Sequence, residues 1–559
     1  MRNRRLVVSV AAIAAGVGLI PGVAQADPAK PDARGASTPD LDLGKAAASK
    51  SKGHTFTSPA DRTVRKALPS AKTGAAGAAA VQSAEDNPNL TVGLTGYGTS
   101  AHGIELKSTL TSVSTPLEVT IDWGDQKTDV VSASGSQVLT NGHTYAEVGA
   151  YTVKVTVKDT ANGVSAVNEL QAVTPGSDFT PHTPTRLLDT RFGTGVAQGK
   201  VGPGKSTRVK VGGNGKIPAG VTAVALNVTV TNTTDSGFIT AFPEGTERPE
   251  TSNVNHKAGQ TVPNLVIVPV GKNGYVELSN RGWQSVDLIA DVTGYFSRTA
   301  SSGYTPVDPT RFVDTREGLG TAKRKLGGQS TFGTQISGLR GVPQGITAVA
   351  LNVTVTAPQG GGHLTVYPSG GAIPTTSNLN FLAGQTIANS VIVPVSADGK
   401  ISVFNGAWAP ADVVVDVVGY YSKDSQSAFL PLVPERVFDT RDPNDATYGP
   451  LWGDSYIYLP ISHDDPSVTG FVLNSTVTNT NGNGYLTVTP DPNSADDYLN
   501  ETAIWPTPPN SSNLNWTKGD TVPNLVQAST GSNGIIDFWN RGWDDIDLVV
   551  DLFGLYQKG

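Results

Sequence analysis

The chain has 559 residues, too many for one hydrophobic core, and this length allows three to five domains. It contains no cysteine, which excludes disulfides, thiolate metal sites and a cysteine nucleophile. The formal net charge is −7, and an acidic chain is a poor candidate for binding nucleic acid or anionic membranes. The 63 glycines and 37 prolines predict many short strands joined by tight turns.

Residues 1–26 have the pattern of a secretory signal peptide. Three arginines precede an apolar run that ends at Pro21, and a small-x-small cleavage site follows at Ala24-Gln25-Ala26. The apolar run is short for a membrane span and is followed at once by a helix breaker. We therefore expect a secreted, extracellular protein with no membrane span. Removing the three arginines with this segment changes the net charge from −7 to −10.

Residues 27–86 are rich in Ala, Pro, Ser, Lys and Gly and contain few large apolar side chains. Such a segment cannot bury enough apolar surface to offset the entropy lost on ordering. The composition predicts a disordered linker between the signal peptide and the first folded domain.

Residues 87–175 predict a separate β domain. Leu117–Asp122 alternates apolar and polar residues and leads into Trp123-Gly124-Asp125-Gln126, and His143-Thr144-Tyr145 precedes a second alternating run at 149–158. These motifs resemble the PKD family of immunoglobulin-like sandwiches, in which the turn usually reads Trp-Gly-Asp-Gly. The resemblance implies an extracellular spacer or weak binding domain. It places the tryptophan at the edge of the sandwich, with contact to a sugar as the alternative.

From residue 179 onward the chain repeats one module three times, at 179–298, 303–423 and 428–559. Each copy opens on an Asp-Thr-Arg segment, continues through a strand with a central asparagine and a Ser-Asn-x-Asn segment, and closes on a strand with two aspartates. A unit of this size can bury its own core. We therefore predict an all-β protein, an Ig-like sandwich followed by three tandem sandwich or jelly-roll-like domains, with a closed three-part assembly as the alternative.

The region 179–559 also resembles modules that recur in secreted actinobacterial proteins of the streptomycete type. The Ala- and Gly-rich signal segment is similar to those of high-GC Gram-positive bacteria. This resemblance implies an extracellular location and a fold, and it implies no particular ligand.

The recurring charged residues predict a structural latch within each repeat. Two buried carboxylates on the closing strand need partners, and the arginine of the opening Asp-Thr-Arg segment can pair with them in a bidentate manner. Calcium binding by Asp and Asn oxygens is one alternative, and acid/base catalysis of glycoside hydrolysis is another. The predicted latch residues are Asp189, Arg191, Asp287 and Asp291 in the first repeat, Asp314, Arg316, Asp412 and Asp416 in the second, and Asp439, Arg441, Asp547 and Asp551 in the third.

The central strand asparagines are Asn227, Asn352 and Asn474, and strand alternation places Asn227 and Asn352 on a face of small residues. Small neighbours let another backbone approach closely, and a buried amide must be satisfied. We expect each asparagine to bond such a backbone, with a bound ligand as the alternative.

One tryptophan recurs four residues before the first closing aspartate, at Trp283, Trp408 and Trp543. In two copies it ends an Asn-Arg-Gly-Trp sequence that is typical of a turn. The tryptophans are candidate stacking platforms for sugar rings, with Asn280, Arg281, Asn540 and Arg541 as hydrogen-bonding partners. The alternative is a tryptophan that plugs the open end of the sandwich.

Enzyme motifs are missing from the sequence. It has no His-Glu-x-x-His, no Gly-x-Ser-x-Gly and no phosphate-binding glycine loop, and its seven histidines do not recur in register. We therefore predict a non-catalytic protein that needs no cofactor and binds polysaccharide or a cell-wall surface through three weak sites. The alternatives are an extracellular spacer without a small ligand and an uncharacterised hydrolase.

Overall fold

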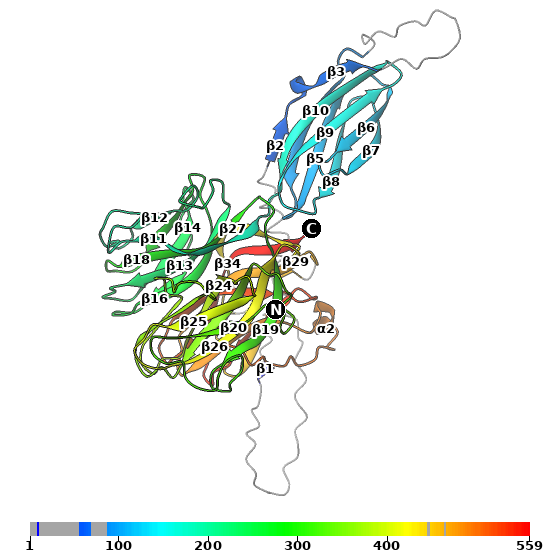
Figure 1. The fold of residues 1–559 in the computed structure, drawn as a ribbon. Helices are drawn as coiled ribbons and strands as arrows, with labels where there is room; N and C mark the ends of the chain where they lie inside the picture. Colours follow the sequence, from blue (N-terminus) through cyan, green and yellow to red (C-terminus); the bar gives the residue numbers. More distant parts are fainter. Residues whose placement is uncertain (1–7, 10–54, 69–86, 444–447, 463–464) are drawn as a thin grey trace, which may run out of the picture. The chain divides into compact units, whose positions relative to one another are not determined.

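The computed structural model describes residues 8–9, 55–68, 87–443, 448–462 and 465–559 (Figure 1). These residues are almost entirely β, which confirms the predicted fold class. They divide into two compact units, the first with residues 178–297 and 301–556 and the second with the residues from 55 to 177, together with 298–300 and 557–559. Apart from β1 (Val8–Ser9), the predicted signal peptide lies outside the described residues.

The second unit is a sandwich of two antiparallel sheets with strand orders β2-β4-β5-β8 and β3-β10-β9-β6-β7. Its strands are β2 (Thr55–Ser58), β3 (Val64–Ala67), β4 (Thr91–Gly98), β5 (Gly103–Thr111), β6 (Pro116–Asp122), β7 (Thr128–Ser134), β8 (Gln137–Thr144), β9 (Ala150–Asp159) and β10 (Val164–Val173). Trp123 is fully buried between the sheets, stacks on His143 with ring centroids 4.7 Å apart, and donates its Nε1 hydrogen to Asp129. This tryptophan is therefore a core residue, and the alternative of a sugar contact at Trp123 is wrong.

The predicted linker 27–86 is wrong for residues 55–67. Strand β2 pairs with β4 and strand β3 pairs with β10, with the short 3-10 helix Ala60–Arg62 between them. The Ser58 hydroxyl also donates to the buried Asn168 side chain at 2.8 Å. The composition of this segment did not reveal the two strands because they are held mainly by backbone hydrogen bonds, which need no apolar pattern. Residues 27–54 and 69–86 lie outside the described residues.

The first unit contains the three repeats, each with an inner and an outer sheet of four strands of its own, and β1 adds a fifth strand to the third outer sheet by pairing with β28. Inner orders are β11-β18-β13-β16, β19-β26-β21-β24 and β27-β34-β29-β32, and outer orders are β12-β17-β14-β15, β20-β25-β22-β23 and β28-β33-β30-β31. A bridge between Tyr304 and Ser427 joins the inner sheets of the second and third repeats into one sheet.

The strand bounds repeat closely from copy to copy. The first repeat has β11 (Asp178–Asp189), β12 (Ser206–Lys210), β13 (Ala223–Thr231), β14 (Gly237–Pro243), β15 (Val254–His256), β16 (Val262–Pro269), β17 (Tyr275–Asn280) and β18 (Asp287–Ser297). The second has β19 (Gly303–Asp314), β20 (Ser330–Gln335), β21 (Ala348–Thr356), β22 (Gly362–Pro368), β23 (Leu379–Phe381), β24 (Ile387–Pro394), β25 (Lys400–Asn405) and β26 (Asp412–Ser422). The third has β27 (Ser427–Asp439), β28 (Ser455–Pro460), β29 (Val468–Thr478), β30 (Gly484–Pro490), helix α2 (Ala495–Leu499), β31 (Leu514–Trp516), β32 (Val522–Ser529), β33 (Ile535–Asn540) and β34 (Asp547–Lys558).

The central strand asparagines join the repeats into a closed ring. Each side-chain amide donates to the backbone carbonyl of a serine in the next repeat: Asn227 to Ser377, Asn352 to Ser512, and Asn474 back to Ser252 of the first repeat. Each asparagine thus bonds a backbone, but the backbone belongs to a neighbouring repeat. The repeats therefore form a closed three-part assembly, and each depends on its neighbours to cover the asparagine-bearing face of its inner sheet.

Two further sets of side chains reinforce this ring. A second asparagine in each repeat donates to a strand asparagine of another repeat: Asn264 to Asn474, Asn389 to Asn227, and Asn524 to Asn352. Six aromatic residues at equivalent positions, each at most 1% exposed, pack together at the other end of the inner strands: Phe179, Phe296, Tyr304, Tyr421, Phe429 and Tyr556. All three repeats thus contribute to one hydrophobic cluster, while the second repeat also has a cluster of its own.

Asn352→Ala should destabilise the whole ring. The substitution leaves the Ser512 carbonyl without its donor and the Asn524 amide without one acceptor, at a cost of about 1–3 kcal/mol. Urea unfolding followed by far-UV circular dichroism measures this cost. The control is Asn273→Ala, at an exposed asparagine, and an equal loss of stability in both variants would contradict the bridging role of Asn352.

Candidate functional site

The three recurring tryptophans lie in the turn between the outer-sheet strand and the closing inner strand of each repeat, as between β17 and β18. Their side chains are 81% (Trp283), 90% (Trp408) and 79% (Trp543) exposed. A tryptophan that plugs the end of a sandwich would be buried, so this alternative is wrong. The molecule instead presents three large aromatic faces to solvent at equivalent positions.

The asparagine that begins each turn is buried and holds the turn together. In the first repeat the Asn280 amide donates to the carbonyls of Val201 (2.9 Å) and Gln284 (2.8 Å), and its Oδ1 accepts from Gly282 N (2.8 Å). Asn540 makes the same set of bonds in the third repeat. The prediction that Asn280 and Asn540 contact a ligand is therefore wrong, because both amide hydrogens are already donated within the turn.

A close backbone approach fixes the same turn from the other side. A Cβ atom on Gly237, at the start of β14, would lie 2.5 Å from Gly282 Cα, and one on Gly484 would lie 2.7 Å from Gly542 Cα. The glycine of each Asn-Arg-Gly-Trp turn thus packs against the start of an outer strand. The turn is held rigidly while its tryptophan points outward.

The arginines of the turns differ between repeats. Arg281 is exposed, whereas Arg541 forms an ion pair with Asp454 at 2.5 Å. The third repeat has a second partly exposed tryptophan beside this turn, Trp452 (47% exposed), whose carbonyl accepts from the Asn540 amide at 3.0 Å. Sequence reasoning missed Trp452 because the other repeats have no counterpart to it.

A pocket of about 200 Å³ lies where all three repeats meet. Its walls are built from equivalent residues, among them Asn255, Asn380 and Asn515 and the threonines Thr261, Thr386 and Thr521. An ion pair between Lys257 and Asp520 (2.8 Å) joins the first and third repeats beside it. Val262 lines the pocket and pairs with Val230 of β13. On its other side Val230 pairs with Leu288, which follows the tryptophan turn at the start of β18. The pocket therefore lies at the end of the inner sheet where β18 begins. The tryptophan turns and this pocket therefore share one end of the strands.

The latch exists, but the arginine that forms it differs from the predicted one. Arg186 donates to both oxygens of the buried Asp291 (2.9 and 3.2 Å) and to Asp189 (3.1 Å). Arg191 instead folds back onto Asp189, two residues away. The reason is register, because β11 pairs with β18 so that Arg186 lies opposite Asp291.

The other repeats follow the same pattern. Arg311 pairs with Asp416 and Arg436 with Asp551, while Arg316 and Arg441 bond Asp314 and Asp439 within their own turns. The first closing aspartate accepts from the threonine of the Asp-Thr-Arg segment: Asp287 from Thr190, Asp412 from Thr315, and Asp547 from Thr440. These carboxylates are thus occupied by donors of the protein itself.

Burial and hydrogen bonding act on these carboxyl groups in opposite directions. Burial raises the pKa of Asp291 despite its bond to Arg186. Burial also acts to raise the pKa of Asp189, but hydrogen bonds from the Arg191 side chain and backbone outweigh it and lower that pKa. Across the described ranges, no group of three or more His, Cys, Asp or Glu side chains has the arrangement to hold a metal ion.

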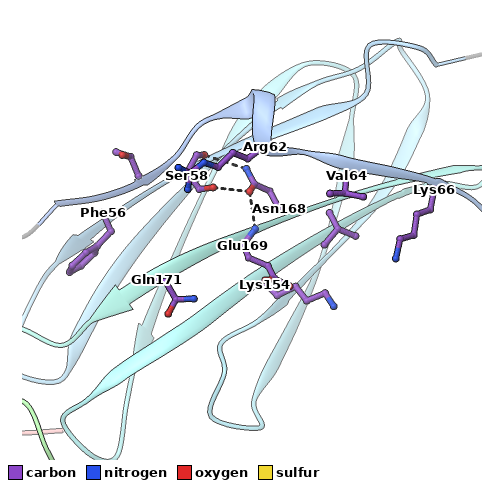
Figure 2. Close-up of a pocket in the computed structure, with 11 residues that line it drawn as sticks. Phe56, Ser58, Arg62, Val64, Lys66, Lys154, Asn168, Glu169 and Gln171 are labelled. Carbon is purple, nitrogen blue, oxygen red and sulfur yellow. Dashed lines mark hydrogen bonds between the residues drawn. The ribbon is translucent and has the colours of Figure 1, made fainter.

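A groove of about 630 Å³ runs beside β2 and β3 in the second unit, as Figure 2 shows. Arg62, Lys66 and Lys154 line it together with Glu169. The buried Asn168 lies beside it, and its amide donates to backbone carbonyls while its oxygen accepts from the Ser58 hydroxyl and Glu169 N. This amide therefore serves to attach β2 to the sandwich.

The third repeat carries an insertion, residues 491–508, that covers the outer face of its outer sheet. Asp491 accepts from Asn493 N (2.6 Å), Asn493 Nδ2 (2.9 Å) and the Tyr498 hydroxyl (2.5 Å). Asp537 of β33 is fully buried, and within the described residues neither of its carboxyl oxygens has a hydrogen-bond partner. Burial, and then the neighbouring Asp491, raise the pKa of Asp537 well above its usual value.

No family model matches the chain, and no curated protein matches it either. Among solved structures, the chain is similar to a SusE-like protein at 9% identity (37% of this chain, 96% of the other, TM-score 0.11) and to the N-terminal CBM22-1-CBM22-2 tandem domain from Paenibacillus barcinonensis Xyn10C at 11% identity (42% and 98%, TM-score 0.15). A triple jelly roll from the turret of an archaeal virus matches at 10% identity (69% and 90%, TM-score 0.14). Similarities this low establish neither a family nor a ligand. No helix in the described part of the chain is long and apolar enough to cross a membrane.

Arg186→Ala should destabilise the protein more than Arg191→Ala. The first change leaves Asp291 buried without its partner, which costs up to about 3–5 kcal/mol, whereas the second leaves Asp189 still paired with Arg186. Chemical unfolding of the two variants measures the difference. Equal losses, or a larger loss for Arg191→Ala, would contradict the assignment of Arg186 as the latch.

Asp537→Asn should raise the melting temperature, and the gain should grow with pH. A carboxyl group whose folded pKa is raised binds its proton more tightly in the folded state, so folding stability falls as pH rises from the unfolded pKa through the folded one. An amide at this position does not titrate and so carries no such dependence. Thermal melts of variant and wild type from pH 4 to pH 8 test this, and parallel curves across that range would contradict a raised pKa of Asp537.

Proposed function

We propose that this protein is a secreted, non-catalytic binding protein that attaches to polysaccharide or a cell-wall surface through its three tryptophan turns. The observation that carries the proposal is the exposure of Trp283, Trp408 and Trp543, each 79–90% exposed at equivalent positions. Tryptophan is highly buried on average in folded proteins, so its exposure at the same position of all three repeats needs a reason.

The flat, largely apolar indole ring of tryptophan can stack on the apolar face of a sugar ring. An indole covers on the order of 150–250 Å² when buried and still has an N–H to donate. Because the Asn280 bonds fix the turn, little conformational entropy is lost when a ligand stacks on Trp283. Each turn is thus a small, preorganised site of modest affinity.

The closed ring makes three weak sites into one stronger surface. The strand asparagines bond from repeat to repeat, so the three turns keep fixed positions in one rigid body. A second site then binds at a high effective concentration once the first is occupied, if the ligand can reach both. A polymer with repeating sugars meets this condition, whereas a single small molecule gains nothing from the ring.

One observation favours a second candidate, an extracellular spacer without a small ligand. The polar residues that recur in every repeat, such as Asp291 and Asn280, are used up in building the fold. Repetition of these residues therefore reflects structure alone. The two candidates differ in what they assign to the tryptophans, and this is what an experiment can separate.

The triple variant Trp283→Ala, Trp408→Ala, Trp543→Ala should lose binding and keep its stability. At about 0.5–1.5 kcal/mol for each lost aromatic contact, the apparent affinity for insoluble ligand should fall at least tenfold. Pull-down on chitin, cellulose and purified cell wall measures binding, and a thermal melt measures stability. Exposed side chains contribute little to folding, so the melting temperature should change by no more than about 2 °C.

Two control variants make the result specific. Phe192→Ala removes an aromatic residue that is 74% exposed outside the tryptophan turns and should leave binding intact. Trp539→Ala removes a fully buried tryptophan and should lower the melting temperature. The binding proposal fails if the triple variant binds as the wild type does. A clearly lower melting temperature of that variant would instead favour the extracellular spacer.

A further inference from the structure

The third repeat has a cleft of about 570 Å³ between its insertion and the first strand of the second repeat. This volume is within the range of about 300–1,000 Å³ that is typical of ligand pockets. Asp308 and Pro309 of β19 form one side, and Trp505, Pro506 and Asp491 belong to the insertion side. The first and second repeats lack the insertion.

The insertion is built as a rigid wall. Asn493 donates its side chain to the Ile504 carbonyl (2.9 Å) and accepts from Ile504 N (2.7 Å), which closes the loop across its base. Ser494 and Asp497 form a capping box at the start of α2. Several prolines line the cleft, and their fixed φ angles leave little freedom to lose on binding.

Trp505 is supported from behind by two aromatic residues of the outer sheet. Its ring meets Tyr456 edge-on with centroids 5.4 Å apart and lies 6.4 Å from Trp539. Trp505 is itself only partly buried and lines the cleft. It thus presents an aromatic surface of fixed orientation, supported in the way that a stacking platform requires.

The polar groups of the cleft define the class of ligand. Hydroxyls of Thr489 and Thr507, the Asn533 amide and the carboxylates of Asp308 and Asp491 line it, and among its described lining residues none carries a positive charge. Anionic ligands such as phosphates or uronates are therefore disfavoured. Hydroxyl groups that both donate and accept, carried on a ring with an apolar face, satisfy such a lining.

We propose that this cleft is a separate binding site for a neutral oligosaccharide, present in the third repeat alone. Trp505 supplies the stacking surface, and the side chains of Asp308, Thr489 and Thr507 supply the hydrogen bonds. The site stands on its own lining and does not require that the tryptophan turns bind ligand.

The test uses the full chain with soluble cellohexaose and chitohexaose, and with an oligogalacturonate as the anionic probe. Saturation-transfer NMR and isothermal titration calorimetry should show binding of a neutral probe and none of the anionic one. Ser532→Trp places an indole in the cleft from an exposed turn and should weaken binding at least tenfold. Thr507→Trp blocks the cleft from the opposite wall and should have the same effect if Ser532→Trp does not fold.

The matched control is Ala397→Trp, at the equivalent exposed turn of the second repeat, which has no insertion and should bind as the wild type does. The triple tryptophan-turn variant should also keep this binding. The cleft proposal is overturned if no neutral probe binds, if both blocking variants bind normally, or if the triple variant abolishes binding of the soluble probes. Retention of the wild type on insoluble polysaccharide would still support the tryptophan turns in each of these cases.

Discussion

The structure depends on one interaction, the hydrogen bond from a strand asparagine to a backbone carbonyl of the next repeat. A buried amide without a partner costs folding free energy, and within the first unit the bonds of Asn227, Asn352 and Asn474 are completed by neighbouring repeats. The alanines beside Asn227 and Asn352 let the sheets come close enough for this bond to form. Ring closure then creates the shared aromatic core at one end of the strands and a pocket at the other.

This constraint separates the residues that fold the molecule from those that are free to bind. The carboxylates of the latch are hydrogen-bonded within the protein. Asp291 accepts from Arg186, and Asp287 accepts from Thr190 and Asn232. The turn asparagine is also fully bonded, and it is this bonding that leaves the tryptophan beyond it exposed. Recurrence in the sequence therefore marks two different things, internal bonding for the polar residues and surface presentation for the tryptophans.

Sequence reasoning succeeded where strand alternation alone decides the outcome. It placed Asn227 on a small-residue face and identified the tryptophan turns, because period-two patterns and turn residues are local. It assigned the wrong arginine to the latch because an irregular register between β11 and β18 decides whether Arg186 or Arg191 faces Asp291. It missed β2 and β3 because backbone pairing leaves no apolar pattern. It also could not locate the pocket among the repeats, which exists only once the ring has closed.

The third repeat shows how the ring tolerates change in one member. At the position of Asp537 the first repeat has Glu277 and the second has Ser402, on the face of the outer sheet that points away from the shared core. Substitution and insertion there leave the asparagine bonds untouched, because those bonds lie on the inner sheets. The insertion therefore brings Asp491 near the buried Asp537, whose pKa is raised, and places Trp505 beside a new cleft without disturbing closure. Three copies thus keep the architecture, while one outer face differs from the other two.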